Sequence, residues 1–378
     1  MNKVIYFTNA VSPSAFKEYL KDWRVSPNLS NQNFHSKLIK AISLYNKVEV
    51  VSVRPINKNY AHKVLYPLKK EEGNILWNYP KATVNKVSKY LFLNKRISDV
   101  LSLCDNNDVV FVDALNLSLV KSAKKYASRH NLKVFGVCTD NPYNISFVSN
   151  GYTNKLMKLA KSLDGYIVLT SAIEKLFNVS NKLCLIIDGV NEDVKDFDKS
   201  PINGKYIYFG GSLMREYGLY DLMDAFESLD LKDIKLVICG HHLRNDLFDK
   251  INGKQNIVYL GPVSYEDNLA LEKGAILSVN PRPINPIIDD YSIPSKTLEC
   301  LSIGTLNITV NNQLLKEHYE DCIIWSKSSD KEDLKVAIQN ALSLSDKDKE
   351  RIISKGKEKV MERTSFEVIG KQIHDLIS

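Results

Sequence analysis

Residues 291–299 read Tyr291-Ser292-Ile293-Pro294-Ser295-Lys296-Thr297-Leu298-Glu299. They follow an apolar run, Ala275–Val279, and an irregular segment rich in Pro and Asn, and they precede a helical pattern that stops at Gly304. This order predicts a strand, a loop and then the first turn of a helix. Because proline is pre-set for the first turn of a helix, we expect the helix to begin around Pro294.

The start of this helix has the features of an anion site. The first amides of a helix have no carbonyl partner inside it, so we expect the N–H groups of Ser295, Lys296 and Thr297 to face the preceding loop. The hydroxyls of Ser295 and Thr297 add donors and Lys296 adds a positive charge, so a phosphate would fit there. Glu299 lies one turn further in, where a carboxylate is better placed to accept hydrogen bonds from sugar hydroxyls. The alternative is an ordinary capped helix with a solvated Lys and Glu on its surface.

Length and composition are those of a globular protein with more than one core. A chain of 378 residues suggests two domains of roughly 150–200 residues each. The apolar content of 44% is ordinary, and no stretch approaches the ~18 uninterrupted apolar residues of a membrane helix. The N-terminus runs straight into a strand-like Val4–Phe7, so we expect no signal peptide. The six cysteines are scattered and form no CxxC pair, which argues against a zinc site and a disulfide framework and predicts a cytoplasmic setting.

Charge is unevenly distributed along the chain. Residues 1–190 contain 27 Lys and Arg against 13 Asp and Glu, a balance of +14, whereas the whole chain carries +7. Such a basic half attracts nucleic acid or the anionic leaflet of a membrane. Its densest piece, Trp77–Arg96, mixes basic residues with aromatic rings and could lie at a lipid interface. The alternative is that these lysines are simply solvated. We take an anionic membrane surface as a candidate partner and rank nucleic acid last, because the chain has no recognised nucleic-acid-binding module.

Short apolar runs alternate with helical patterns in both halves, which predicts parallel sheets covered on both faces. The connector Leu185–Glu192 separates two such series, and the alternation restarts at Tyr206. We therefore expect an α/β chain with a first doubly wound domain over residues 1–190, a second over residues 191–360, and a C-terminal helix over residues 361–378 that returns to the first domain. Two such domains would place a ligand cleft between the carboxyl ends of their sheets.

Two loops of the second half carry glycine at the end of an expected strand. In Tyr208–Gly218 a Gly-Gly pair would let the backbone approach a ligand, and Arg215 could bind a diphosphate with both arms of its guanidinium. This loop lacks the GxGxxG dinucleotide fingerprint, and a Gly-Gly turn is more often just a turn. In Cys239-Gly240-His241-His242 the histidines could contact a base or sugar, although paired loop histidines are usually solvent groups.

Three ordered stretches resemble the retaining glycosyltransferases of the GT-B fold, close to the large family-4 group. They are YFGGSLMREYG (208–218), LVICG (236–240) followed by VYLGPVSYEDNLA (258–270), and NPRP (280–283) followed by YSIPSKTLECLSIGT (291–305). The likeness covers the second domain and extends weakly to the first. The last stretch is most similar to bacterial enzymes that build capsular or exopolysaccharide repeat units from nucleotide sugars.

The resemblance implies roles for individual residues. Glu299 would bind the donor ribose, the amides of residues 295–297 would hold the phosphates, and backbone groups around Val263 would contact the base. Arg282 would reach phosphate or sugar, or alternatively form a bridge to a carboxylate such as Asp289. The resemblance thus assigns donor binding to Gly210, Gly211, Ser212, Gly240, Val263, Arg282, Ser295, Thr297 and Glu299.

The sequence departs from the family pattern at one glutamate and two basic residues. The family usually has a glutamate eight residues before the one that matches Glu299, and Tyr291 stands there. The family's usual Arg and Lys around the glycine loop fall on Ser212 and Tyr217. Arg215 and Lys296, one from each loop, are the natural substitutes. We therefore expect alanine at either position to depress turnover severely.

The first domain offers fewer candidates. Asp140 follows the expected strand Leu132–Val137 and could orient a sugar or an acceptor hydroxyl, whereas Asn141 before Pro is ordinary turn chemistry. Asn31-Gln32-Asn33 could cap a helix or face the acceptor, and His35 is interpreted as structural. The histidine that family members often carry near the reacting sugar has no clear equivalent here.

The resemblance implies displacement of a nucleoside diphosphate from the anomeric carbon, with retention, by a hexosyltransferase. The donor, with UDP as the expected nucleotide, is then a co-substrate, the acceptor is a glycan or lipid-linked saccharide, and no cofactor or metal is required. Preorganised amides and cations at the leaving group would be the main contribution. Two alternatives stay open: a nucleotide-sugar epimerase of the same fold, and a non-catalytic accessory subunit, for which Tyr291 argues. We expect a cytoplasmic protein, with a peripheral position at the inner face of the cell membrane as a further expectation.

Overall fold

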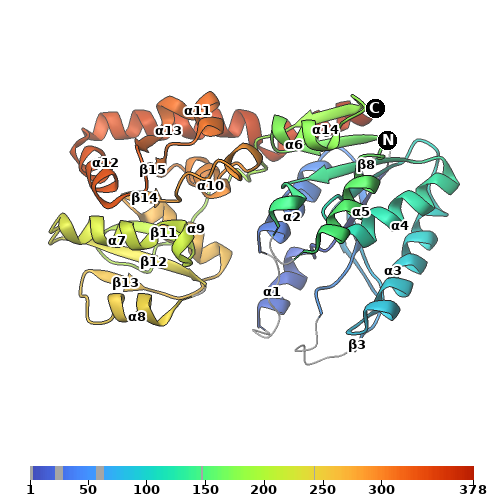
Figure 1. Ribbon diagram of the computed structural model, residues 1–378, viewed down its shortest axis with the longest axis horizontal. Coiled ribbons are helices and arrows are strands. Elements are labelled where there is room, and N and C mark those ends of the chain that lie inside the picture. The colour runs from blue at the N-terminus through green and yellow to red at the C-terminus, as the bar shows by residue number, and fades with distance from the viewer. Residues whose placement is uncertain (1–2, 22–28, 57–63, 146–147, 242) are drawn as a thin grey trace. The chain divides into compact units, whose positions relative to one another are not determined.

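The structure is a computed structural model that describes residues 3–21, 29–56, 64–145, 148–241 and 243–378 (Figure 1). It divides into two compact units: residues 1–190 with residues 364–378, here called unit 1, and residues 191–363, here called unit 2. The chain therefore leaves unit 1, completes unit 2 and then contributes its last helix to unit 1.

The main sheet of unit 1 runs in the order β10-β9-β8-β7-β1-β2-β5-β4, with β1 at its centre. All neighbours are parallel except β4 and β5. A separate antiparallel pair joins β3 and β6. The strands of the main sheet are β1 (Lys3–Thr8), β2 (Lys47–Ser52), β4 (Leu68–Glu72), β5 (Ile75–Tyr79), β7 (Val109–Asp113), β8 (Lys133–Cys138), β9 (Gly165–Val168) and β10 (Leu183–Ile186), and the short pair is β3 (Val64–Leu65) and β6 (Ala82–Thr83).

Helices cover both faces of this sheet. Helix α2 packs against α14, and together they bury one face of β1 and β2, whereas α4 packs between α3 and α5 and contacts β1, β7 and β8. Side chains of α14 such as Phe366, Ile369 and Ile373 belong to the same core cluster as Leu38 of α2. The helices are α1 (Pro13–Lys21), α2 (Leu29–Ser43), α3 (Lys86–Leu101), α4 (Leu117–Ala127), α5 (Asn150–Ala160), α6 (Ser171–Phe177) and α14 (Phe366–Ile377), with the short turns η1 (Ser128–His130) and η2 (Pro142–Asn144).

The basic and aromatic segment 77–96 is not a single interfacial element. Trp77 and Tyr79 lie in β5 at 1% exposure each, and their rings stack at a centroid distance of 6.3 Å inside the core. The expectation that these two rings reach a lipid surface is therefore wrong, because the alternating pattern of a strand buries them. The exposed apolar side chains of this region are Val87 and Leu91 on α3. No helix in the described part of the chain is both long and apolar enough to cross a membrane.

The sheet of unit 2 has six parallel strands in the order β13-β12-β11-β14-β15-β16. Counted along the chain this is the order 3-2-1-4-5-6 of a doubly wound sheet, in which the direction of winding reverses between the first and fourth strands. The predicted α/β class with doubly wound domains is confirmed. The strands are β11 (Lys205–Ser212), β12 (Ile234–His241), β13 (Ile257–Tyr259), β14 (Leu277–Asn280), β15 (Asn307–Val310) and β16 (Ile324–Ser326).

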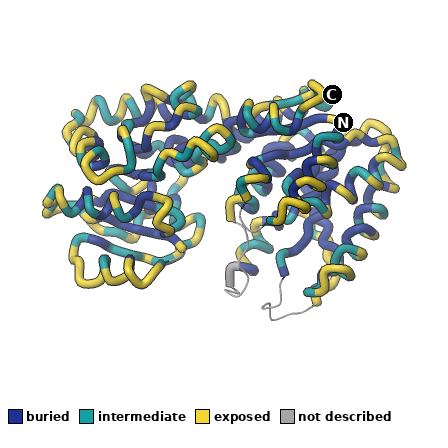
Figure 2. Tube along the Cα trace, in the orientation of Figure 1, coloured by how far each residue is buried: buried dark blue, intermediate teal, exposed yellow. Residues whose placement is uncertain are grey.

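Alternate residues of β11 face different helix layers. Ile207 and Phe209 enter the cluster formed with α7 and α12, while Tyr206 and Tyr208 enter a second cluster with Leu271 of α9. Helix α10 packs beside α9. In Figure 2 the strands of the sheet are drawn mostly in dark blue, because their residues are buried between the helix layers. The helices are α7 (Leu219–Ser228), α8 (Asn245–Ile251), α9 (Tyr265–Gly274), α10 (Ser295–Ile303), α11 (Gln313–Tyr319), α12 (Lys331–Ser343) and α13 (Asp346–Thr364), with the turns η3 (Arg215–Tyr217), η4 (Asp289–Tyr291) and η5 (Glu320–Cys322).

Candidate active site

The winding of unit 2 reverses between β11 and β14, and the loops that follow these two strands meet there. Loops that leave adjacent parallel strands in opposite directions open a crevice at the carboxyl edge of the sheet. Gly218, which precedes α7, has φ +76°, and a Cβ placed on it would lie 2.0 Å from the carbonyl oxygen of Pro281 in the loop after β14. The two loops therefore touch backbone to backbone, and only glycine fits at this contact.

Helix α10 begins where the sequence predicts, with Pro294 at its N-cap and Gly304 in the left-handed region at its C-cap. Ser295 is exposed at the first helical position. The expectation of a free amide and hydroxyl on Thr297 is wrong. The Thr297 amide donates to the Pro294 carbonyl at 3.0 Å, and its fully buried hydroxyl bonds Asn280 at 3.1 Å and Thr309 at 2.9 Å. The hydroxyl of Thr297 thus fastens α10 to β14 and β15.

Lys296 and Glu299 form an ion pair one turn into α10. The Nζ atom of Lys296 lies 2.9 Å from Oε1 of Glu299, and the two side chains are 44% and 9% exposed. Burial acts to lower the pKa of Lys296, but the negative charges of Glu299 and Glu272 outweigh it and raise that pKa, so the ammonium stays charged. An ammonium has three N–H donors, and the exposed side of Lys296 can present the remaining ones to an anion.

A second buried carboxyl, Glu272 on α9, lies behind this pair. Glu272 is 3% exposed, and Ser278 Oγ donates to its Oε1 at 3.0 Å. Within the described residues, its Oε2 has no hydrogen-bond partner. Burial, followed by the charge of Glu299, raises the pKa of Glu272 to about 7, against the opposing effects of Lys296 and Ser278. One ammonium is therefore shared between two carboxyls, and the inner carboxyl holds its proton more tightly than usual.

We expect Glu272→Gln to flatten the pH dependence of stability. An unfolded glutamate has a pKa of about 4.3, so between that value and about 7 the folded chain holds a proton that the unfolded chain has released. The free energy of unfolding of the wild type should therefore fall as pH rises through this window, by on the order of 2 to 3 kcal/mol, and the loss should be complete above it. Urea unfolding at pH 5 and pH 8 measures the difference. An equal fall in both proteins would contradict a raised pKa at Glu272.

Two of the three glycines at the strand ends, Gly210 and Gly240, have structural reasons to be glycine. A Cβ on Gly240 would lie 1.8 Å from the carbonyl oxygen of its register partner Gly211, and one on Gly210 would lie 2.6 Å from the Tyr208 hydroxyl oxygen. A Cβ on Gly211 would meet only Phe209, at 3.8 Å. Ser212 Oγ accepts a long hydrogen bond of 3.5 Å from the Met214 amide. Of these predicted ligand contacts, Gly211 is the position where the backbone is most open.

Arg215 lies in η3, directly after the glycine loop, and is exposed. Its guanidinium carbon is 5.3 Å from the centre of the Tyr220 ring on α7. Lys250 of α8 also lies over that ring, and Asp246 accepts a hydrogen bond from the Tyr220 hydroxyl at 3.0 Å. Arg215 therefore rests on an aromatic face.

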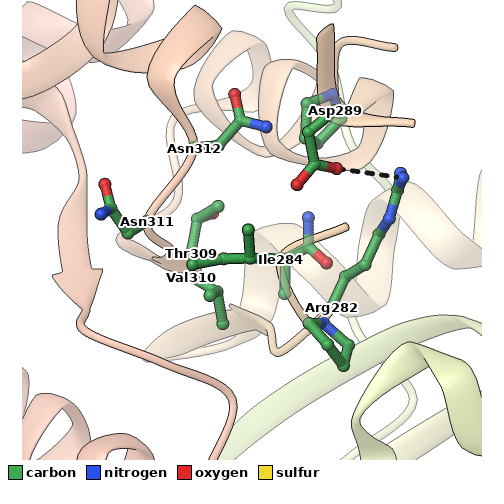
Figure 3. A pocket seen from close by; sticks show the side chains of 10 residues that line it. Arg282, Ile284, Asp289, Thr309, Val310, Asn311 and Asn312 are labelled. Atoms are coloured by element: carbon green, nitrogen blue, oxygen red, sulfur yellow. Dashed lines mark hydrogen bonds and ion pairs between the residues drawn. The ribbon is translucent and has the colours of Figure 1, made fainter. Parts of the chain in front are cut away.

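Arg282 forms an ion pair with Asp289, which was the predicted alternative to a contact with phosphate or sugar. Its Nη2 lies 3.4 Å from Oδ1 of Asp289, whose other oxygen accepts the Asn285 amide at 2.7 Å. Figure 3 shows this pair at one side of a small pocket, with Asn311 at another side. Its lining consists of Asn280, Arg282, Pro283, Ile284, Asp289, Pro294, Thr309, Val310, Asn311 and Asn312. The pocket opens at the carboxyl ends of β14 and β15, beside the first turn of α10.

Two other predicted positions of unit 2 lie at the same edge of the sheet. Val263 precedes α9, and its side chain packs on the cluster that contains Tyr206 and Tyr208. His241 ends β12 and is exposed, whereas His242 lies outside the described residues. Among the described residues there is no group of three His, Cys, Asp or Glu side chains that could hold a metal ion, and all six cysteines are free thiols.

In unit 1, Asp140 is exposed just beyond β8 and accepts a hydrogen bond from the Thr139 hydroxyl at 3.0 Å. Asn141 Oδ1 accepts the Tyr143 amide at 3.0 Å, which confirms its reading as a turn residue. Gln32 binds both backbone groups of Val11 at 2.8 Å and so fixes the loop after β1.

Sequence reasoning missed a buried polar group at the centre of unit 1. The Asp113 carboxylate, at the end of β7, accepts the Asn31 amide at 3.0 Å and lies 3.7 Å from His35 Nε2. His35 Nδ1 bonds the Tyr6 hydroxyl at 2.6 Å, and burial lowers the pKa of His35 despite the charge of Asp113. The reading of His35 as structural is consistent with these contacts. Asp113 had a stronger signal than Asp140: it directly follows an apolar run, whereas Thr139 separates Asp140 from its strand.

Comparison with known protein families identifies a match for unit 2. Residues 191–359 match the family model described as glycosyl transferases group 1. This range covers almost the whole of unit 2 and includes the helix start, the ion pair and both glycine loops. Over this range the chain is similar to that family. No curated protein sequence matches the chain.

Solved structures match the chain along its full length. A sucrose-phosphate synthase from Thermosynechococcus elongatus is 13% identical, with a TM-score of 0.68 over 100% of this chain and 98% of its own. An alpha,alpha-trehalose-phosphate synthase (UDP-forming) from Burkholderia xenovorans, in complex with glucose-6-phosphate, is 11% identical, with a TM-score of 0.67 over 100% of both chains. An E. coli protein described as trehalose-6-phosphate, bound with UDP-2-fluoro glucose, is 11% identical, with a TM-score of 0.68 over 100% of this chain and 99% of its own. At these identities the likeness establishes the fold, which is the α/β GT-B type with Rossmann-like domains.

Proposed function

We propose that this chain is a retaining glycosyltransferase, close to family 4, that moves a hexose from a UDP-sugar to a glycan or lipid-linked saccharide in cell-surface polysaccharide synthesis. The observation that carries the proposal is the first turn of α10, where Lys296 and Glu299 form a 2.9 Å ion pair beside the switch point of the unit 2 sheet. A cation and a carboxylate a turn apart suit the two ends of a nucleoside diphosphate, its phosphates and its ribose. The group 1 match over residues 191–359 includes this turn.

The proposed chemistry places the leaving diphosphate at the start of α10. The amides of Ser295 and Lys296 have no carbonyl four residues earlier inside the helix, and the helix dipole adds partial positive charge at that end. When the anomeric bond breaks, negative charge grows on the diphosphate, and these amides together with the Lys296 ammonium stabilise it. Arg215 would supply the second cation from the glycine loop. No step requires a metal or another cofactor.

The roles of donor and acceptor residues are extensions of the same proposal. Glu299 would accept hydrogen bonds from the ribose, Gly211 would allow the donor to approach the backbone, and residues around Val263 would contact the base. Two of the solved structures support a UDP-sugar donor and a sugar acceptor by analogy, since one is bound with UDP-2-fluoro glucose and another with glucose-6-phosphate. Asp140 of unit 1 would orient the sugar or the acceptor. We place the reaction in the cytoplasm.

A smaller contact with an anionic membrane surface is part of the proposed function. With Trp77 and Tyr79 buried, the contact would consist of Val87 and Leu91, which are 69% and 61% exposed on α3, together with neighbouring lysines such as Lys86. Apolar side chains flanked by basic ones favour the surface of an anionic bilayer.

Donor hydrolysis and acceptor transfer test the proposal together. Purified protein is titrated calorimetrically with UDP, GDP and dTDP, and it is then assayed with the corresponding hexose donors and a lipid-linked saccharide in neutral or phosphatidylserine-containing vesicles. We expect binding of UDP, release of UDP on transfer, retention of the anomeric configuration in the product, and faster transfer in the anionic vesicles. Binding of none of the nucleotides would overturn the proposal. Binding without turnover of any donor would favour the accessory-subunit reading.

A further inference from the structure

Asn268 of α9 connects the central strand of unit 2 to the carboxylate of Glu299. The Tyr208 hydroxyl donates to Asn268 Oδ1 at 2.8 Å, and Asn268 Nδ2 donates to Glu299 Oε1 at 3.4 Å. The same oxygen accepts Lys296 Nζ at 2.9 Å. Glu299 Oε1 is therefore held from two helices, by a cation on α10 and by an amide on α9.

The amide of Asn268 has only one orientation that satisfies both neighbours. An asparagine side chain has an acceptor oxygen on one side and an NH2 donor group on the other. Burial raises the pKa of Tyr208 well above its usual value, so the phenol keeps its proton and acts as the donor. The Asn268 oxygen must then face Tyr208, and its NH2 group must face the carboxylate. Turning the amide around would set its oxygen against the negative charge of Glu299.

The placement of Tyr208 depends on the strand and on the glycine after it. Tyr206 and Tyr208 alternate with Ile207 and so point to the face of the sheet that α9 covers. The Tyr208 hydroxyl oxygen occupies space that a Cβ on Gly210 would take, since the two atoms would be 2.6 Å apart. Gly210 is thus needed for this contact, independently of any approach of a ligand to the backbone.

We propose that Asn268, oriented by Tyr208, is a positioning residue that holds the Glu299 carboxylate in the direction required to bind the ribose hydroxyls of the donor nucleotide. This inference rests on the proposed function, because it requires that a nucleoside diphosphate binds at the start of α10. Without Asn268, Glu299 would lose the donor that reaches it from α9, and a carboxylate that is held by fewer donors is oriented less well. The ribose contact should then weaken, while the phosphate contacts of the helix start should persist.

The role of Asn268 should appear as a preference for nucleotides that carry the 2′ and 3′ ribose hydroxyls. The wild type should bind UDP more tightly than 2′,3′-dideoxy-UDP, because only UDP offers hydroxyls to Glu299. In Asn268→Leu, which keeps the approximate volume but has no donor, we expect the preference to fall by about tenfold, the usual scale for one hydrogen bond to a charged group. The loss should come from weaker UDP binding, with the affinity for the dideoxy analogue unchanged.

Tyrosine variants on β11 provide a matched pair. Tyr208→Phe removes only the hydroxyl that orients Asn268, so it should reduce the UDP preference in the same direction by a smaller factor. Tyr206→Phe is the control, because Tyr206 lies on the same strand and the same face but its hydroxyl donates to the Leu271 carbonyl, at 2.6 Å, rather than to Asn268. We expect its UDP preference to equal that of the wild type. Where Asn268→Leu fails to fold, the difference between the two Phe variants carries the test.

Isothermal titration of the full chain with both nucleotides decides the matter, and the guanosine pair replaces the uridine pair if the donor screen selects GDP. A wild-type preference that persists in Asn268→Leu, or that falls equally in Tyr206→Phe and Tyr208→Phe, would overturn the role of Asn268 and leave the proposed function standing. A wild type that binds neither UDP nor GDP would overturn both. A donor KM that rises in Asn268→Leu while kcat changes little would support a role in ground-state positioning.

Discussion

The Lys296→Ala variant is expected to transfer sugar about 100-fold more slowly than the wild type, or slower still. Lys296 is the charged group at the start of α10, and charge grows on the leaving diphosphate only as the anomeric bond breaks, so its loss should fall mainly on kcat. The substitution also leaves Glu299, whose side chain is 9% exposed, without its 2.9 Å cation partner. A buried carboxylate without a counter-charge is costly, so the free energy of unfolding should fall as well.

Two further variants separate charge from packing at this position. Lys296→Met keeps the apolar stem and removes the charge, so it should be as slow as Lys296→Ala while packing better. Lys355→Ala breaks an exposed ion pair with Asp321 in the same unit and should leave turnover unchanged. Steady-state rates with the donor chosen by the screen, measured beside urea unfolding curves, provide both quantities. Turnover near the wild-type value in Lys296→Met would remove Lys296 from the mechanism. Arg215→Ala belongs in the same series and is expected to be slow.

The Gly218→Ala variant is expected to lose about 2 to 4 kcal/mol of stability together with most of its nucleotide affinity. Gly218 has φ +76°, where an L side chain is strained, and its added Cβ would lie 2.0 Å from the Pro281 carbonyl oxygen. That atom belongs to the backbone, so the loops after β11 and β14 would have to separate. These loops border the proposed diphosphate site, and a displacement of about 1 Å in such a site is enough to cost much of its activity.

Gly253→Ala is the matched control for this variant. Gly253 has φ +81° in the same unit, but nothing lies within 4 Å of the position of its Cβ. It therefore shows the cost of backbone strain alone, about 1 kcal/mol or slightly more, with nucleotide binding unchanged. Equal losses of stability and affinity in the two variants would show that the contact between Gly218 and Pro281 has no separate role.

Periodicity was sufficient to predict the central strands and the longer helices. The alternation that was expected to restart at Tyr206 does so with β11, and the helix expected between Pro294 and Gly304 corresponds to α10, because both elements are bordered by strong turn residues. Elements with weak local signals were missed. Strand β5 carries Trp77, which reads as part of a basic aromatic surface until its neighbours β2 and β4 show that it is an interior strand. Pairing of that kind depends on residues far apart in the chain.

The site was predictable where its chemistry is local. Pro294, Lys296 and Glu299 lie within six residues of one another, so one helix start specifies all three. Asn268 and Tyr208 gave no signal, because they are separated by 60 positions and meet only once α9 packs on β11. The prediction that the Thr297 hydroxyl is free was wrong for a related reason. A threonine at the start of a helix can turn to the loop or to the core, and the partners Asn280 and Thr309 that decide between them lie on other strands.

The discontinuity of unit 1 sets an order of events during synthesis. Its core includes Phe366, Ile369 and Ile373, which the ribosome adds only after all of residues 191–363 have been made. By then the whole sequence of unit 2 has been made, whereas the apolar face of α2 is not yet covered by α14. During synthesis, all residues of unit 2 are therefore made before those that complete the core of unit 1.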